Sequence, residues 1–95
     1  MRKALQDITE NIEKRIPLSQ NDIVLDIGAN DGTLLKEYKS KITRIGCEPA
    51  KNILHKLRKN SEYVINNFWD IKHYQALMSP AHWPLAKVVT AIGMF

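Results

Sequence analysis

The sequence predicts an α/β protein in which helices flank an open, parallel sheet of about four strands. Short β-branched apolar runs alternate with amphipathic segments along the 95 residues, a pattern typical of right-handed βαβ units. The run at 23–27 is almost continuously apolar, as expected of a strand that helices cover on both faces. A chain of this length forms at most one domain. We therefore expect 1–95 to be a single unit, with a leading helix in 1–17 and βαβ units from 22 to 95.

The leading helix is predicted over Arg2 to Arg15. Leu5, Ile8 and Ile12 recur at three- and four-residue spacing, and Pro17 ends the pattern. We interpret this apolar stripe as a surface that docks on the protein's own sheet.

The remaining strands and helices are predicted from the spacing of apolar residues and from the prolines that interrupt it. Strands are predicted at 23–27, 42–48, 63–65 and 87–92, helices at 33–39, 50–57 and 70–78, and a loop at 82–84. The sequence stops soon after the last predicted strand, whereas open α/β sheets usually have more strands. We therefore expect part of a larger sheet, either a piece of a longer chain or a naturally short protein.

Composition narrows the class of protein. Hydrophobic residues make up 44% and charged residues 25%, as in soluble globular proteins. There is no apolar run of the roughly 20 residues that span a bilayer, and the charged N-terminus is unlike a secretory signal. The single cysteine, Cys47, excludes an internal disulfide. We expect a cytoplasmic protein with no membrane partner, and no metal site, because the three histidines lack ligand spacing.

The turn after the first strand is the most informative segment. It reads Asp26-Ile27-Gly28-Ala29-Asn30-Asp31-Gly32, and ligands of such sheets bind beyond the carboxyl ends of the strands. Glycine permits positive φ and close approach of a ligand to the backbone. Asn30 tolerates a left-handed conformation and can stand where a second glycine might. The next helix begins near Gly32 and presents free backbone N–H groups.

A second acidic residue, Glu48, ends the second predicted strand, 22 residues after Asp26. A carboxylate at this place can accept both hydroxyls of a ribose. The dinucleotide fingerprint G-x-G-x-x-G requires its last glycine one residue later than Gly32, and Asp31 would lie close to a pyrophosphate. The charges instead suit S-adenosylmethionine, which has a ribose, an adenine and a cationic end but no phosphate. A purely structural turn, with Asp26 capping local N–H groups, is the alternative.

These segments resemble a known superfamily. Residues 24–32 look like motif I of class I S-adenosylmethionine-dependent methyltransferases, and 45–49 are similar to the acidic motif that ends their second strand. With 91–95, they most resemble the sugar C-methyltransferase-like family. The resemblance implies the donor-binding half of a Rossmann-like fold, S-adenosylmethionine as cofactor, and methyl transfer to a small-molecule acceptor, with a sugar favoured. It also implies that strand 87–92 lacks a neighbour and that the protein self-associates through this edge.

The resemblance also assigns roles to residues. The backbone at Gly28 and Asn30 would hold the methionine part, Glu48 the ribose, Asn67 the adenine edge and Phe68 the adenine ring. The donor-site residues that we expect are Asp26, Gly28, Ala29, Asn30, Gly32, Glu48, Pro49, Asn67, Phe68, Ala91 and Ile92. No catalytic residue is expected here, because the family's acceptor site and catalytic base lie beyond this part. We expect the 95 residues to bind donor weakly or not at all, and not to turn over. Asn30 departs from the family's usual middle glycine.

Other interpretations stay open. The chain would instead be an NAD(P)-type dinucleotide-binding oxidoreductase domain, or a non-catalytic interaction module with the same fold. Phe68 and Trp69 are equally compatible with core packing, and Cys47 is interpreted as a small buried residue. The basic segment around His55, with Lys51, Lys56, Arg58 and Lys59, is interpreted as a solvated face, so a nucleic-acid partner is not expected.

Overall fold

A computed structural model describes residues 2–77 and 86–91 of the chain. Helices and strands alternate along these residues, as the sequence predicts. In chain order they are α1 (Arg2–Arg15), β1 (Ile23–Ile27), α2 (Thr33–Lys36), β2 (Thr43–Cys47), α3 (Leu54–Lys59), β3 (Tyr63–Ile65), α4 (Ile71–Leu77) and β4 (Val88–Thr90). The α/β class is therefore confirmed. Met78, the loop at 82–84 and Ile92 lie outside the described residues.

The four strands form one sheet of order β3-β2-β1-β4, in which every neighbouring pair is parallel. Ile27 at the end of β1 is in register with Cys47 at the end of β2, and Asp26 is in register with Thr90 of β4. The chain runs from β1 outward to β3 and then returns to the other side of β1. The strand order therefore reverses at β1, and the carboxyl ends of all four strands share one rim, where ligands of open α/β sheets bind.

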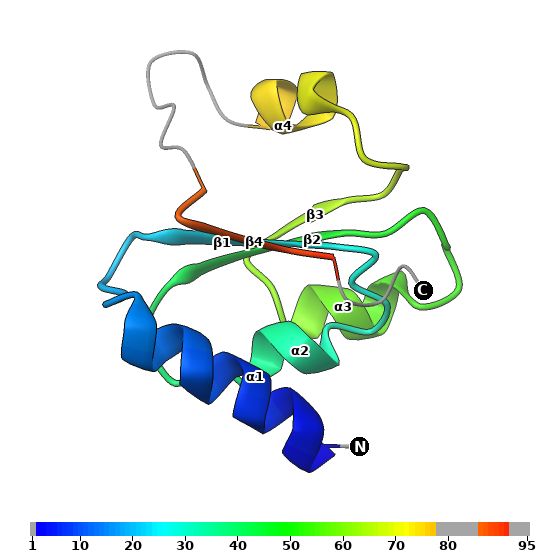
Figure 1. Cartoon of the computed structure of the whole chain (residues 1–95). Helices are drawn as coiled ribbons and strands as arrows, with labels where there is room; N and C mark the ends of the chain where they lie inside the picture. Colours follow the sequence, from blue (N-terminus) through cyan, green and yellow to red (C-terminus); the bar gives the residue numbers. More distant parts are fainter. Residues whose placement is uncertain (1, 78–85, 92–95) are drawn as a thin grey trace.

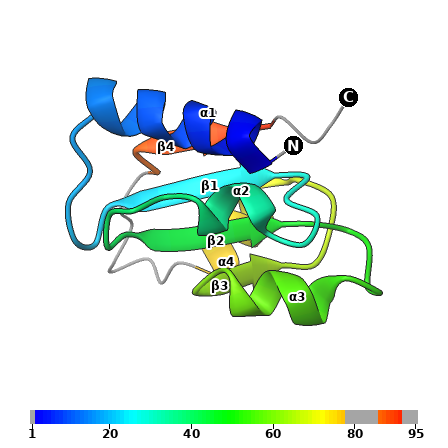
Figure 2. The same ribbon diagram turned by 90° about the horizontal axis from the view of Figure 1, so that it is seen from below.

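The sheet lies between two layers of helices. Figure 1 shows α1, α2 and α3 on one face and α4 on the other, and Figure 2 shows the three-helix face directly. Consecutive residues of β1 serve opposite layers, because Val24 packs in the core under the three helices whereas Ile23 and Leu25 pack in the core on the α4 side. Strand β1 is thus buried on both faces, as predicted.

The leading helix docks on its own sheet. Ile12 of α1 and Ile16, which directly follows the helix, pack against the core that contains Val24 of β1 and Val88 of β4. This confirms the interpretation of the apolar stripe as an intramolecular surface.

Two helices are shorter than the sequence predicts, and side chains at their ends explain why. Helix α2 ends at Lys36 rather than Lys39, where the Arg44 guanidinium donates to the carbonyl oxygens of Leu35 and Tyr38, each at 2.7 Å. The Leu35 carbonyl also accepts the Tyr38 N–H at 3.4 Å, so the Arg44 bonds hold the segment that follows α2 against β2. Helix α3 begins at Leu54 rather than near Ala50, whose N–H donates to the Glu48 carboxylate at 3.0 Å.

Strand β4 is shorter than the predicted 87–92 and lies at the edge of the sheet, paired with β1 among the described residues. Val89 of this strand is 55% exposed. Pairing of this edge with a second copy stays a prediction. No helix among the described residues has the length and apolarity to cross a membrane.

Candidate functional site

The loop that joins β1 to α2 is held in an unusual backbone conformation. Gly28, Asn30 and Gly32 have φ values of 72°, 55° and 84°, in the left-handed region where glycine and asparagine are favoured. The N–H groups of Gly28 and Ala29 donate to the Cys47 carbonyl at 2.9 and 3.0 Å. These bonds fix the loop to the end of β2.

The Glu48 carboxylate lies against this loop on the same rim of the sheet. Its Oε1 accepts the Asn30 N–H at 2.8 Å, and its Oε2 accepts the Ala50 N–H at 3.0 Å. The residue is 7% exposed. The Asn66 amide, after β3, donates to the Glu48 carbonyl at 2.9 Å. Each carboxylate oxygen keeps a further lone pair for a ligand donor, because a carboxylate has about four acceptor positions.

A cavity of about 230 Å³ opens beside this carboxylate. Six of the predicted site residues line it: Gly28, Asn30, Glu48, Pro49, Asn67 and Phe68. Ile27, Cys47 and Trp69 also line the cavity, although they are not among the predicted site residues. Ile27 and Cys47 end the paired strands β1 and β2, so their position at the strand ends was the available signal.

Other predicted residues surround the loop without lining this cavity. Ala29 is 5% exposed and packs in the core under the helices. Gly32 abuts α3, where a Cβ on it would lie 2.7 Å from the Asn60 Cβ. Ala91 is exposed just beyond β4, and the predicted Ile92 lies outside the described residues.

Asp26 does not line the cavity either, because it is buried beneath the loop at 3% exposure. Thr90 of β4 donates its hydroxyl to Asp26 Oδ1 at 2.8 Å. Burial raises the pKa of Asp26 to about 6, the Thr90 hydrogen bond opposes this rise, and the Glu48 charge adds to it. Above that pH the carboxylate places a negative charge inside the protein, close to the carboxyl rim.

The aromatic side chains at this rim are accessible. Phe68 is 75% exposed, so it is not a core residue. Trp69 is 38% exposed and packs edge-on against Tyr74, with ring centroids 6.1 Å apart. The Asn67 side chain already has partners within the protein: its Oδ1 accepts the Phe68 N–H at 2.8 Å, and its Nδ2 lies 3.3 Å from His73 Nε2.

Cys47 is 1% exposed, which confirms its interpretation as a small buried residue. Its thiol donates to the Asn67 carbonyl at 3.3 Å, and burial raises the pKa of the thiol. The described residues contain no group of three or more His, Cys, Asp or Glu side chains that could hold a metal ion.

These features define a Rossmann-like α/β protein with a small cavity at the point where its strand order reverses. No family model matches the chain, and a search of curated proteins found no match.

Proposed function

We propose that the chain binds S-adenosylmethionine and forms the donor-binding part of a methyltransferase that acts on a small molecule, with a sugar as the favoured acceptor class. The observation that carries the proposal is the 2.8 Å bond between Glu48 Oε1 and the Asn30 N–H. It holds a carboxylate at the mouth of a cavity, between a tight turn with positive φ and an exposed aromatic side chain.

The residues around the cavity suit the parts of this donor. The two backbone bonds to Glu48 fix its orientation and leave lone pairs for ribose hydroxyls. Phe68 offers a flat apolar face to an adenine ring. The charge on Asp26 favours a cationic ligand, since it is buried in a region of low dielectric. The cavity of about 230 Å³ is smaller than the roughly 300–1,000 Å³ of most ligand sites. We therefore propose that it holds the nucleoside part and binds weakly.

When bound, the donor supplies an activated methyl group on its sulfonium. The contribution of this chain is to bind and orient that group for direct displacement, in which proximity and alignment lower the barrier. No residue of this chain is proposed as an acid or base.

The proposal is tested by titration followed in ¹H–¹⁵N NMR spectra, which detect weak binding. S-adenosylhomocysteine is expected to shift the amide signals of Gly28, Asn30 and Phe68, and NAD is expected to bind more weakly, because Asp26 and Glu48 disfavour its pyrophosphate. Tighter binding of NAD, with shifts at these same three amides, would favour the dinucleotide alternative and contradict the proposal. Absence of any shift at about 10 mM ligand, well above the affinity of useful sites, would contradict it too.

A pair of variants isolates the carboxylate. Glu48→Gln is expected to weaken S-adenosylhomocysteine binding about 10-fold, the size of one charged hydrogen bond. Glu62→Gln is the matched control, because Glu62 also accepts a backbone N–H, from Arg44 at 2.7 Å, but it is exposed and does not line the cavity. Phe68→Ala, at a side chain too exposed to affect folding, is expected to weaken binding several-fold. Unchanged affinity in both Glu48→Gln and Phe68→Ala would refute the assignment.

A further inference from the structure

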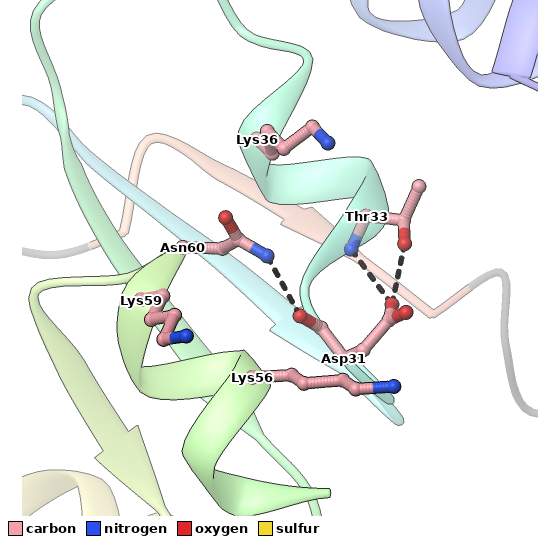
Figure 3. A pocket seen from close by; sticks show the side chains of 6 residues that line it. All are labelled: Asp31, Thr33, Lys36, Lys56, Lys59 and Asn60. Atoms are coloured by element: carbon pink, nitrogen blue, oxygen red, sulfur yellow. Dashed lines mark hydrogen bonds between the residues drawn. The ribbon is translucent and has the colours of Figure 1, made fainter.

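A second cavity, of about 410 Å³, lies between α2 and α3 and is lined by Asp31, Thr33, Lys36, Lys56, Lys59 and Asn60. Figure 3 shows Lys36 on α2 and the other two lysines on α3, around the Asp31 loop. Lys56 and Lys59 are three residues apart, so they lie on one face of their helix.

Positive charge is concentrated in this part of the molecule. Residues 49–61 contain Lys51, Lys56, Arg58 and Lys59 and no acidic residue. The whole chain has 14 basic and 10 acidic residues, so outside this segment ten basic residues balance ten acidic ones. The segment thus accounts for the formal net charge of +4. Lys36, on α2, adds a further charge to the cavity from the opposite side.

The amines of this cavity are not neutralised by ion pairs within the described part of the chain. The salt bridges there join Lys39 to Glu10, Arg44 to Glu62 and Lys87 to Asp22. Asp31 is the acidic residue of the cavity, and its pKa is lowered chiefly by the Thr33 hydroxyl, with smaller effects of the Thr33 N–H and the Lys56 charge. Three ammonium groups and one carboxylate leave an excess of positive charge that faces solvent.

The wall of the cavity is held in place by the fold. The Asn60 amide donates to the Asp31 carbonyl at 2.8 Å, and both the hydroxyl and the N–H of Thr33 donate to the Asp31 carboxylate. Gly32 packs directly against Asn60. These bonds join the start of α2 to the end of α3, the two helices from which the exposed lysine side chains project.

We propose that this cavity binds the phosphate group of a small molecule, a monoester or a diphosphate. Ammonium groups from two helices around one cavity suit a compact anion. A nucleic-acid strand fits less well, because Lys51 and Arg58 do not line the cavity and no aromatic residue among its lining offers a surface for bases. The site is separate from the Glu48 cavity and does not depend on the proposed function.

The test uses inorganic pyrophosphate as the probe, in NMR titrations of the 95-residue protein. Pyrophosphate is expected to shift the amide signals of Thr33, Lys59 and Asn60, and the shifts are expected to disappear near 1 M salt, where the Debye length is about 3 Å. No shift at about 10 mM pyrophosphate would overturn the proposal. So would binding of a single-stranded oligonucleotide without binding of pyrophosphate.

Two exposed neighbours on α3 provide a matched pair of variants. Lys59→Gln and Arg58→Gln each remove one positive charge from an exposed side chain, but only Lys59 lines the cavity. Lys59→Gln is expected to weaken pyrophosphate binding about 5-fold and Arg58→Gln less than about 2-fold, on the scale of a close charge pair in water. Asp31→Asn, which removes the opposing charge, is expected to strengthen binding about 3-fold. Equal losses in the two α3 variants would show diffuse attraction to a basic surface and refute a site in the cavity.

Discussion

The two cavities that flank the loop from Gly28 to Gly32 have opposite charge. Asn30 lines the cavity at the carboxyl rim, together with Glu48 and two aromatic side chains, whereas the next residue, Asp31, lines the cavity with three lysines. Asn30 and Gly32 have positive φ, and the Gly32 N–H donates to the Ala29 carbonyl at 3.0 Å. In this tight turn the consecutive residues Asn30 and Asp31 line different cavities. A single strand–turn–helix segment therefore separates a cavity lined by a carboxylate and aromatic side chains from a cavity lined mainly by lysines.

The largest effect is expected at Gly32, which lies between Asp31 and Thr33, two residues that line the basic cavity. Gly32→Ala is expected to lower the free energy of unfolding by about 3 kcal/mol. A side chain there must adopt a φ of 84°, and its Cβ would lie 2.7 Å from the Asn60 Cβ. Urea unfolding followed by circular dichroism measures the change. A loss below about 1 kcal/mol would show that α3 moves away readily and that the cavities are not held rigidly.

A substitution at Asp26 tests whether its buried negative charge lowers the free energy of unfolding. Its pKa is raised to about 6 in the folded protein from an ordinary 3.8, so the native state binds this proton more tightly than the unfolded state does. The free energy of unfolding therefore decreases as pH rises from about 4 to about 6, and the penalty persists above that range. Asp26→Asn is expected to be about 2 kcal/mol more stable than the wild type at pH 7.5 and nearly equal to it at pH 4.

The measurement for Asp26 is urea unfolding across this pH range, with Asp7→Asn, at an exposed position on α1, as the control. The control is expected to leave the free energy of unfolding nearly unchanged, because Asp7 lies at an exposed surface position. An Asp26→Asn protein that is less stable than the wild type at every pH would mean that the bond from Thr90 outweighs the burial of charge.

A substitution at Asn60 tests whether the basic cavity can change without a change in the Glu48 cavity. Asn60→Ala removes the 2.8 Å bond to the Asp31 carbonyl and is expected to lower the free energy of unfolding by about 1 kcal/mol. Amide signals of Asp31 and Thr33 should shift in NMR spectra, while those of Asn67 and Phe68 stay in place. Asn52→Ala, at an exposed position before α3, is the control. Equal shifts on both sides would show that the loop transmits the change and that the cavities are coupled.

The smallest effect is expected at Asn30. Asn30→Gly relieves a positive φ of 55° but increases the flexibility of the unfolded chain, so stability should change by less than about 0.5 kcal/mol. Binding of S-adenosylhomocysteine should also change little, because Glu48 accepts the backbone N–H of this residue. A 10-fold loss of affinity would instead show that the Asn30 side chain contacts the ligand.

From the sequence we could predict the α/β class, the helix over Arg2–Arg15 and the strands Ile23–Ile27 and Tyr63–Ile65. The predicted and observed bounds of these three elements agree. The type and bounds of these elements could be predicted because they depend on the periodicity of apolar residues within a short segment. The sequence also indicated that the turn after β1 and Glu48 lie at the same rim, because the carboxyl ends of parallel strands meet there.

Contacts between distant parts of the chain set the remaining features. Arg44 contacts the end of α2, which is shorter than predicted, and Glu48 accepts a backbone N–H from Ala50, before the start of α3. Asp26 and Ala29 are buried in the folded protein, whereas Phe68 is exposed. The tertiary structure also brings Lys36 beside Lys56 and Lys59, which lie 20 or more positions away in the sequence. The physical reason is that side-chain direction, helix ends and charge clusters depend on contacts between residues far apart in the chain, which local periodicity does not encode.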